Sequence, residues 1–115
     1  LKKMHIFTLP SIWPETSCIA AIEAMAAGCE TVTTNLGALY ETCASFGTFV
    51  NFDRNFDNLE KKYKKVLISS IENYWSDKNQ DKLKLQVKTI NSTYSWDVRS
   101  VEWKNFFNDV RKLKA

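Results

Sequence analysis

The sequence predicts an α/β fold in which about three parallel strands are followed by a helical carboxyl-terminal half. Short apolar or β-branched runs at 4–9, 31–34 and 47–52 alternate with helical sequence, as in parallel sheets with crossover helices. After residue 55, apolar residues recur every three to four positions, which predicts helices without further strands. With 115 residues, of which 44% are hydrophobic, the chain forms one domain or part of one.

The first predicted strand and helix meet at a proline-containing loop. The strand at 4–9 (MHIFTL) is nearly continuously apolar, so we expect it to be buried on both faces. Pro10 ends it, because proline cannot continue a sheet ladder. The alanine-rich helix that follows is expected to have Thr16 or Ser17 as N-cap and to stop at Gly28. Its alanines indicate close packing against a sheet.

Two more strands follow this helix. The strand at 31–34 (TVTT) leads into a turn at 35–38, a short helix at 39–44 and the third strand at 47–52. Strand–helix–strand units of this kind have right-handed crossovers and parallel strands. The order predicts a Rossmann-like three-layer α/β/α fold. Such domains usually have about five or six strands, so we expect the front of the domain to lie outside residues 1–115.

The second half is predicted to be helical throughout. Apolar spacing predicts a long amphipathic helix over 56–74 and another over 83–94. A last helix runs over 98–113, with Asp97 as its expected N-cap.

Charge is distributed unevenly along the chain. Residues 1–53 hold two Lys and five acids, a net of −3, whereas residues 54–115 hold 14 Lys and Arg and eight acids, a net of +6. Acids are interleaved with the basic residues, which favours solvated helix faces over a nucleic-acid surface. A peripheral contact with an anionic membrane surface is the weaker alternative.

The cysteines indicate reduced thiols. Cys18, Cys29 and Cys43 are odd in number and form no CxxC pair or Cys/His cluster. We therefore expect buried, reduced thiols in a cytoplasmic protein, and no metal site. The longest apolar run, 19–29, is too short for a membrane span and contains Glu23.

The candidate site lies where the first strand leads into the alanine-rich helix. Ligands bind at the carboxyl ends of parallel strands, and free amides at a helix start attract anions. We expect the amides of Thr16, Ser17, Cys18 and Ile19 to form a phosphate or diphosphate site. Glu15 beside it suits a neutral polyol attached to the phosphate.

A second carboxylate extends this site along the helix. Glu23 is predicted about two turns deeper, roughly 9–10 Å along the axis, near the reach from a diphosphate to a ribose. A carboxylate accepts hydrogen bonds from paired ribose hydroxyls. Structural roles remain open for each residue. Glu15 could be a first-turn acid, Glu23 could pair with a Lys or Arg of the second half, and Thr16 and Ser17 could be ordinary caps.

The segment PETSCIAAIEAMAAG, residues 14–28, resembles the donor-binding motif of GT-B glycosyltransferases of the retaining family 4 type. Glu15 and Glu23 match the E-x7-E pattern of that family. The following TVTT and NLGALYET are similar to its next strand and turn. YSWDVRSVEWKNFF, residues 94–107, is similar to its terminal helix.

The resemblance implies a part of the carboxyl-terminal, nucleotide-sugar-binding domain over residues 1–115. Glu15 would be catalytic, contacting the donor sugar or stabilising charge at the reacting centre. The amides of 16–19 would bind the diphosphate and Glu23 the ribose. The reaction would transfer a sugar from a nucleotide-diphosphate sugar to an acceptor with retention. No cofactor or metal is expected.

The resemblance also implies what lies elsewhere. The family usually supplies an Arg and a Lys for the diphosphate from earlier in the domain, and a separate amino-terminal domain for the acceptor. The chain is therefore expected to be inactive alone. Glu30 and Tyr40 stand where the family often has Pro, which affects loop geometry. Trp13 is assigned to packing rather than to donor stacking.

Two other interpretations remain open. One is a binding or assembly module that keeps the fold without catalysis. The other is a different phosphate-binding α/β protein, such as a flavodoxin-like regulator. It is disfavoured because the first strand is followed by neither an acidic phosphoacceptor nor a Gly-rich loop.

Overall fold

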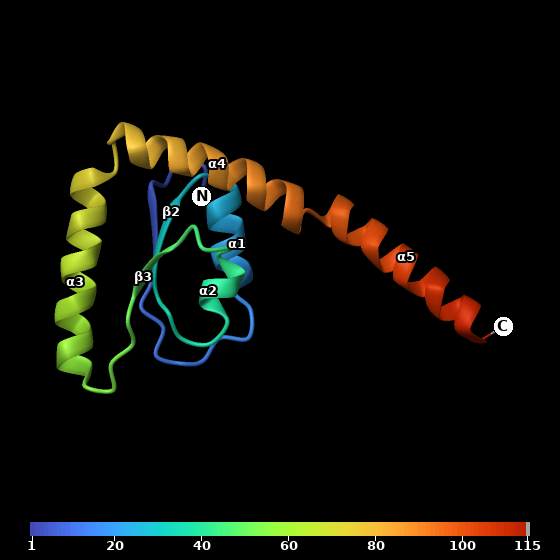
Figure 1. Ribbon diagram of the computed structural model, residues 1–115. Coiled ribbons are helices and arrows are strands. Elements are labelled where there is room, and N and C mark those ends of the chain that lie inside the picture. Colours follow the sequence, from blue (N-terminus) through green and yellow to red (C-terminus); the bar gives the residue numbers. More distant parts are fainter. Residues whose placement is uncertain (115) are drawn as a thin grey trace.

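A computed structural model describes residues 1–114 (Figure 1). Its strands, β1 (Ile6–Leu9), β2 (Glu30–Thr34) and β3 (Thr48–Val50), form one parallel sheet in the order β1-β2-β3. The helices are α1 (Ile19–Ala26), α2 (Leu39–Thr42), α3 (Phe56–Asn73), α4 (Asp77–Tyr94) and α5 (Trp96–Lys114). The predicted fold class, a partial Rossmann-like α/β fold with a helical second half, is confirmed.

Helices cover both faces of the sheet. Figure 1 shows α1 and α2 on one side and α3 on the other, while α4 crosses one end of the sheet. Neighbouring residues of β1 point into different layers. Ile6 packs against the cluster of Val32, Val50, Leu59 and Tyr63, and Phe7 packs against the cluster that contains Ala21, Met25 and Ile90. The alternation of side chains along a strand therefore divides the core into two parts.

The strands differ in burial. All five residues of β2 are buried, as expected of a central parallel strand. β1 was expected to be buried on both faces, but its residues are half-buried or exposed. The reason is that β1 forms an edge of the described sheet and pairs with β2 alone.

The helix ends show where local sequence signals were right. Gly28 follows the C-cap of α1 with φ +91, and its amide donates to Met25 O at 3.1 Å. The amide of Cys29 reaches back to Ala24 O at 2.9 Å, which completes a Schellman motif. The predicted stop at Gly28 is confirmed.

The amino ends of α4 and α5 correct two expectations. α4 begins at Asp77, with Ser76 as N-cap, and thus adds more than a turn to the predicted 83–94. α5 begins at Trp96, and the hydroxyl of Ser95 accepts from the amide of Val98 at 3.3 Å. Ser95 caps this helix, and the expected cap, Asp97, lies in its first turn.

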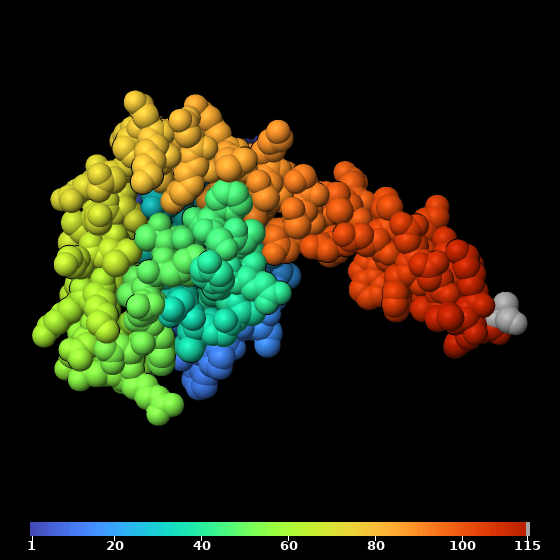
Figure 2. All heavy atoms as spheres, in the orientation of Figure 1, coloured from blue at the N-terminus to red at the C-terminus, as the bar shows by residue number. Residues whose placement is uncertain are grey.

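α5 projects from the rest of the chain (Figures 1 and 2). None of its residues is buried, and the described chain measures 58 × 34 × 20 Å. The exposed side chains include several large aromatic and aliphatic groups: Trp96, Val101, Trp103, Phe106, Phe107 and Leu113.

Candidate functional site

The loop between β1 and α1 is fastened to the end of β2. The hydroxyl of Thr33 donates to Leu9 O at 2.9 Å, and that of Thr34 donates to Ser11 O at 2.7 Å. Both threonines are fully buried. Two adjacent β-branched residues of the central strand thus position the start of the loop at the carboxyl edge of the sheet.

Glu15 is held in this loop through both its side chain and its backbone. The hydroxyl of Ser11 donates to Glu15 Oε1 at 3.2 Å, and the amide of Ala38 donates to Glu15 O at 2.7 Å. Gly37 has φ +63, and a Cβ there would lie 2.5 Å from Glu15 N. Only glycine fits this approach, so the turn after β2 places the half-buried Glu15.

The amino end of α1 is open. Its N-cap is Cys18, with φ −128 and ψ 93, and no side chain accepts from the first-turn amides. The expected caps, Thr16 and Ser17, precede the helix and are exposed. Within the described chain, the amides of Thr16, Ser17, Cys18 and Ile19 donate no hydrogen bond. The prediction that Thr16 or Ser17 is the N-cap is wrong, because the N-cap is Cys18 and the helix begins at Ile19. The four amides are left without a partner among residues 1–114.

The carboxyl end of α1 is satisfied from α4. The side-chain amide of Gln86 is fully buried and donates to Met25 O at 3.1 Å and to Cys29 O at 2.9 Å. The amide of Asn91 donates to Ala26 O at 3.3 Å. Ala26 O is a carbonyl that the helix end leaves unpaired, and Met25 O gains a second donor besides the Gly28 amide. Together these contacts join the carboxyl end of α1 to α4.

Glu23 lies on the exposed side of α1. The buried face of the helix consists of Ala21, Ala24 and Met25, so the carboxylate stays in contact with water. Glu23 takes part in none of the ion pairs among residues 1–114, which removes pairing with a Lys or Arg as its explanation there.

The position of Glu23 differs from the expected one. Because α1 begins at Ile19, Glu23 is only about 6 Å along the axis from the helix start, not two turns. It borders a hollow of about 220 Å³ beside Tyr94, Trp96 and Arg99. The side chain thus faces the junction of α4 and α5.

Two side chains near this site, Trp13 and Cys43, differ sharply in exposure. Trp13 is 74% exposed, so the expectation that it packs is wrong. Burial raises the pKa of the Cys43 thiol to about 11, and the nearby Cys18 adds to the shift. Cys43 is therefore protonated near neutral pH. All three cysteines are free, with Cys18 half-buried rather than buried.

No three His, Cys, Asp or Glu side chains of residues 1–114 lie close enough together to hold a metal ion. No helix within the same residues is long and apolar enough to cross a membrane.

Comparison with known families decides what kind of domain carries this geometry. A family model described as "Glycosyl transferases group 1" matches residues 1–94. The chain belongs to this glycosyltransferase family. The match covers the sheet and α1 to α4 of the glycosyltransferase domain and leaves α5 outside it. No curated protein and no solved structure matches the chain significantly.

Some residues that shape the site escaped sequence reasoning. Gln86 stands between Leu83 and Ile90, at a position where the helical pattern calls for an apolar residue. That mismatch was a usable signal of a buried polar contact. The role of Gly37 had no such signal, since its partner Glu15 is distant in sequence and meets it only through an isolated parallel bridge.

Proposed function

We propose that this chain binds the nucleotide-sugar donor of a glycosyltransferase that transfers a sugar to an acceptor with retention. The observation that carries the proposal is the open amino end of α1 beside Glu15 in a member of the group 1 family. Unpaired amides and the helix dipole attract a diphosphate. Glu15 is proposed as the catalytic residue that faces the sugar, and Glu23 as the ribose acceptor.

The proposal places the amides of Thr16, Ser17, Cys18 and Ile19 on the diphosphate. Several features support this arrangement. The loop that carries them is fastened by Thr33 and Thr34, so they need little ordering when a ligand binds. Their donors are free, as a bound anion requires. No metal or cofactor is part of the proposal, because helix dipole and basic groups stabilise the leaving diphosphate.

The basic groups are proposed to come from another part of the protein. The sequence has no Lys or Arg between Lys3 and Arg54, so α1 and its loops bring no positive charge to a diphosphate. We therefore propose that the isolated chain binds donor weakly and transfers no sugar.

An amino-terminal acceptor domain of the same protein is the proposed partner. The exposed aromatic side chains of α5, Trp103, Phe106 and Phe107, support a further contact, because apolar groups gathered on a surface mark interaction sites. The three free thiols support a cytoplasmic location. A peripheral contact with the inner face of the membrane remains the weaker part of the proposal.

A titration followed by NMR tests donor binding. Nucleoside diphosphates and nucleotide sugars are added to the chain and to its Glu15→Ala, Glu23→Ala and Glu72→Ala variants. We expect saturable shifts at the amides of 16–19 that weaken about tenfold in Glu23→Ala, because a charged hydrogen bond is lost. Glu72 is exposed on α3 and serves as the matched control.

The same titration separates the alternatives. If no nucleotide shifts the amides of 16–19, the chain is a non-catalytic module with the same fold. If Glu23→Ala and Glu72→Ala bind equally, Glu23 is not a ribose ligand. Sugar transfer by the isolated chain would overturn the proposed need for a second domain.

A further inference from the structure

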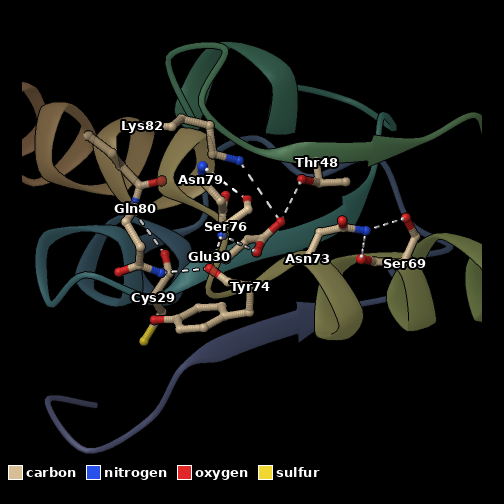
Figure 3. A network of polar contacts seen from close by, with 11 residues as sticks. Cys29, Glu30, Thr48, Ser69, Asn73, Tyr74, Ser76, Asn79, Gln80 and Lys82 are labelled. Atoms are coloured by element: carbon tan, nitrogen blue, oxygen red, sulfur yellow. Dashed lines mark hydrogen bonds and ion pairs between the residues drawn. The ribbon is translucent and has the colours of Figure 1, made fainter.

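A second hollow, bordered mainly by polar and charged residues, lies at the opposite edge of the sheet, where β2 and β3 begin. Figure 3 shows the polar contacts around Glu30 at this edge. The hollow has a volume of about 490 Å³ and is bounded by α3, α4 and the first residues of the two strands. Volumes of about 300–1,000 Å³ are typical of small-molecule sites. The proposed donor site is at the carboxyl ends of the strands, so the two sites are separate.

A buried carboxylate lies at this hollow. Glu30, the first residue of β2, is 5% exposed. Thr48 Oγ1 donates to its Oε1 and Asn79 Nδ2 donates to its Oε2, each at 3.1 Å. Lys82 Nζ lies 3.9 Å from Oε1 (Figure 3). A carboxylate is costly to bury, and these partners compensate for part of that cost. The proposed donor site makes no use of Glu30.

An unpaired hydroxyl faces the same space. Ser70 of α3 is 7% exposed and borders the hollow. Its hydroxyl takes part in none of the hydrogen bonds among residues 1–114, whereas the neighbouring Ser69 is contacted by Asn73. The Ser70 oxygen is not among the fully buried unpaired side-chain atoms, so it is open to the hollow. Water or a ligand in the hollow can therefore pair with it.

The charges around the hollow select the kind of ligand. An anion would meet the carboxylate of Glu30, and a cation would meet the ammonium groups of Lys78 and Lys82. Each hydroxyl of a neutral polyol can both donate and accept, and so matches carboxylate, ammonium, amide and hydroxyl groups together. We propose that this hollow binds a neutral polyhydroxyl compound of monosaccharide size through Glu30, Ser70 and Lys82.

The test is an NMR titration of the full chain with D-glucose and, separately, with myo-inositol. We expect saturable shifts at the amides of Glu30, Thr48 and Ser70. The Ser70→Ala variant should bind about fivefold more weakly, since one hydrogen bond is lost. Because the Ser70 hydroxyl has no partner among residues 1–114, we expect its removal to leave the fold intact. Ser92→Ala, on the exposed side of α4, is the matched control and should bind normally.

A second variant and two charged probes complete the design. Glu30→Gln keeps the shape of the side chain and should weaken binding about tenfold by removing a charged acceptor. Equal binding by Ser70→Ala and Ser92→Ala would overturn the proposal, as would the absence of saturable shifts. Saturable binding of acetate or choline instead of glucose would overturn the neutral ligand class.

The result is independent of the donor site. Shifts by glucose confined to the amides of 16–19 would assign the sugar to the donor site and overturn this inference alone. Failure of every nucleotide to shift those amides would overturn the proposed donor function and leave the polyol site standing.

Discussion

The helices that pack against the sheet begin in two different ways. In α3 the side chain of Asn55 accepts from the amide of Asn58 at 3.2 Å, and in α4 Ser76 accepts from Asn79 at 3.3 Å. α1 has Cys18 at the same place and no side-chain cap. The short α2 likewise has no side-chain cap at Ala38. The two long helices α3 and α4 are therefore capped by side chains, whereas the start of α1, beside the proposed donor site, is not.

The two ends of α1 show the same difference more sharply. Its carboxyl end receives amide donors from Gln86 and Asn91 of α4, while its amino end keeps free donors beside Glu15. The carboxyl end of α1 is thus bound to α4, whereas its amino end is unpaired within residues 1–114. An open end on a fastened helix suits a ligand, because binding then costs little ordering of the protein.

The largest effect is expected at the turn that holds the loop in front of α1. Gly37→Ala should lower the free energy of unfolding by about 3 kcal/mol or more, because the new Cβ would meet the backbone of Glu15 at 2.5 Å. Urea unfolding measures the loss. Gly28→Ala is the control: its φ is also positive, but the nearest atom lies 3.6 Å away. Equal losses in the two variants would contradict the close approach.

Removing the contact between Gln86 of α4 and the carboxyl end of α1 should have the next largest effect. Gln86→Leu removes the buried donor shared by Met25 O and Cys29 O, and among residues 1–114 only Met25 O keeps another donor, the Gly28 amide. We expect a loss of about 2–4 kcal/mol in urea unfolding. Asn91→Ala should cost about 1 kcal/mol or less, because Asn91 is exposed and water replaces it. Similar losses for both would show that Gln86 does not anchor the helix.

The capped and uncapped helix starts should respond differently to alanine. Asn55→Ala should lower the free energy of unfolding by about 1 kcal/mol, because α3 loses its N-cap. Cys18→Ala removes no cap and should change the free energy of unfolding by less than about half of the loss in Asn55→Ala. A loss in Cys18→Ala as large as in Asn55→Ala would show that α1 is capped after all.

Adding a cap to α1 should separate stability from binding. Cys18 already has the extended backbone of an N-cap residue, so Cys18→Asp should raise the free energy of unfolding by about 0.5–1 kcal/mol. Its carboxylate would compete with a diphosphate for the same amides and weaken binding of a nucleoside diphosphate about tenfold. Calorimetry and urea unfolding measure the two effects. A stabilised variant that binds as well as the parent would place the diphosphate elsewhere.

The smallest effect concerns the loop before α3. Lys62 Nζ donates to Asp53 Oδ2 at 2.8 Å, and the amide of Asn55 donates to Asp53 Oδ1 at 2.9 Å. These hydrogen bonds hold the pKa of Asp53 below its ordinary value. Since the folded-state pKa is lowered, the stabilisation is present above about pH 4 and is lost as the pH falls through the folded-state value. Asp53→Asn should therefore lose less stability than the parent between pH 6 and about pH 3. Equal losses would contradict the assignment.

Much of the fold follows from local pattern. The β-branched run at 31–34, the 3–4 spacing of apolar residues after position 55 and Gly28 each predicted their element correctly. Helix starts were less predictable. Thr16 and Ser17 are good caps by type, but the helix begins only at Ile19, and the loop before it is held by Thr33, Thr34 and the bridge between Glu15 and Gly37. Those contacts join residues far apart in sequence, so no local signal reports them.

The candidate site shows the same division. The sequence placed Glu15, the amides of 16–19 and Glu23 near one helix start, but not their surroundings. It could not tell that the apolar run around Glu23 has an exposed side, because the burial of α1 depends on where α4 packs. Nor could it tell that Glu30, expected to affect only loop geometry, is a buried carboxylate with three partners on β3 and α4.

By itself, the sequence determined the class of fold, the order of its elements and the family resemblance, since these rest on periodicity, turn residues and a motif within one segment. The tertiary structure alone decided which helix end stays open, which carboxylates are exposed and which are buried. The physical reason is that a hydrogen bond or a buried face needs a partner from a distant segment. For α1, those partners are the end of β2, the turn at Gly37 and the polar side chains of α4.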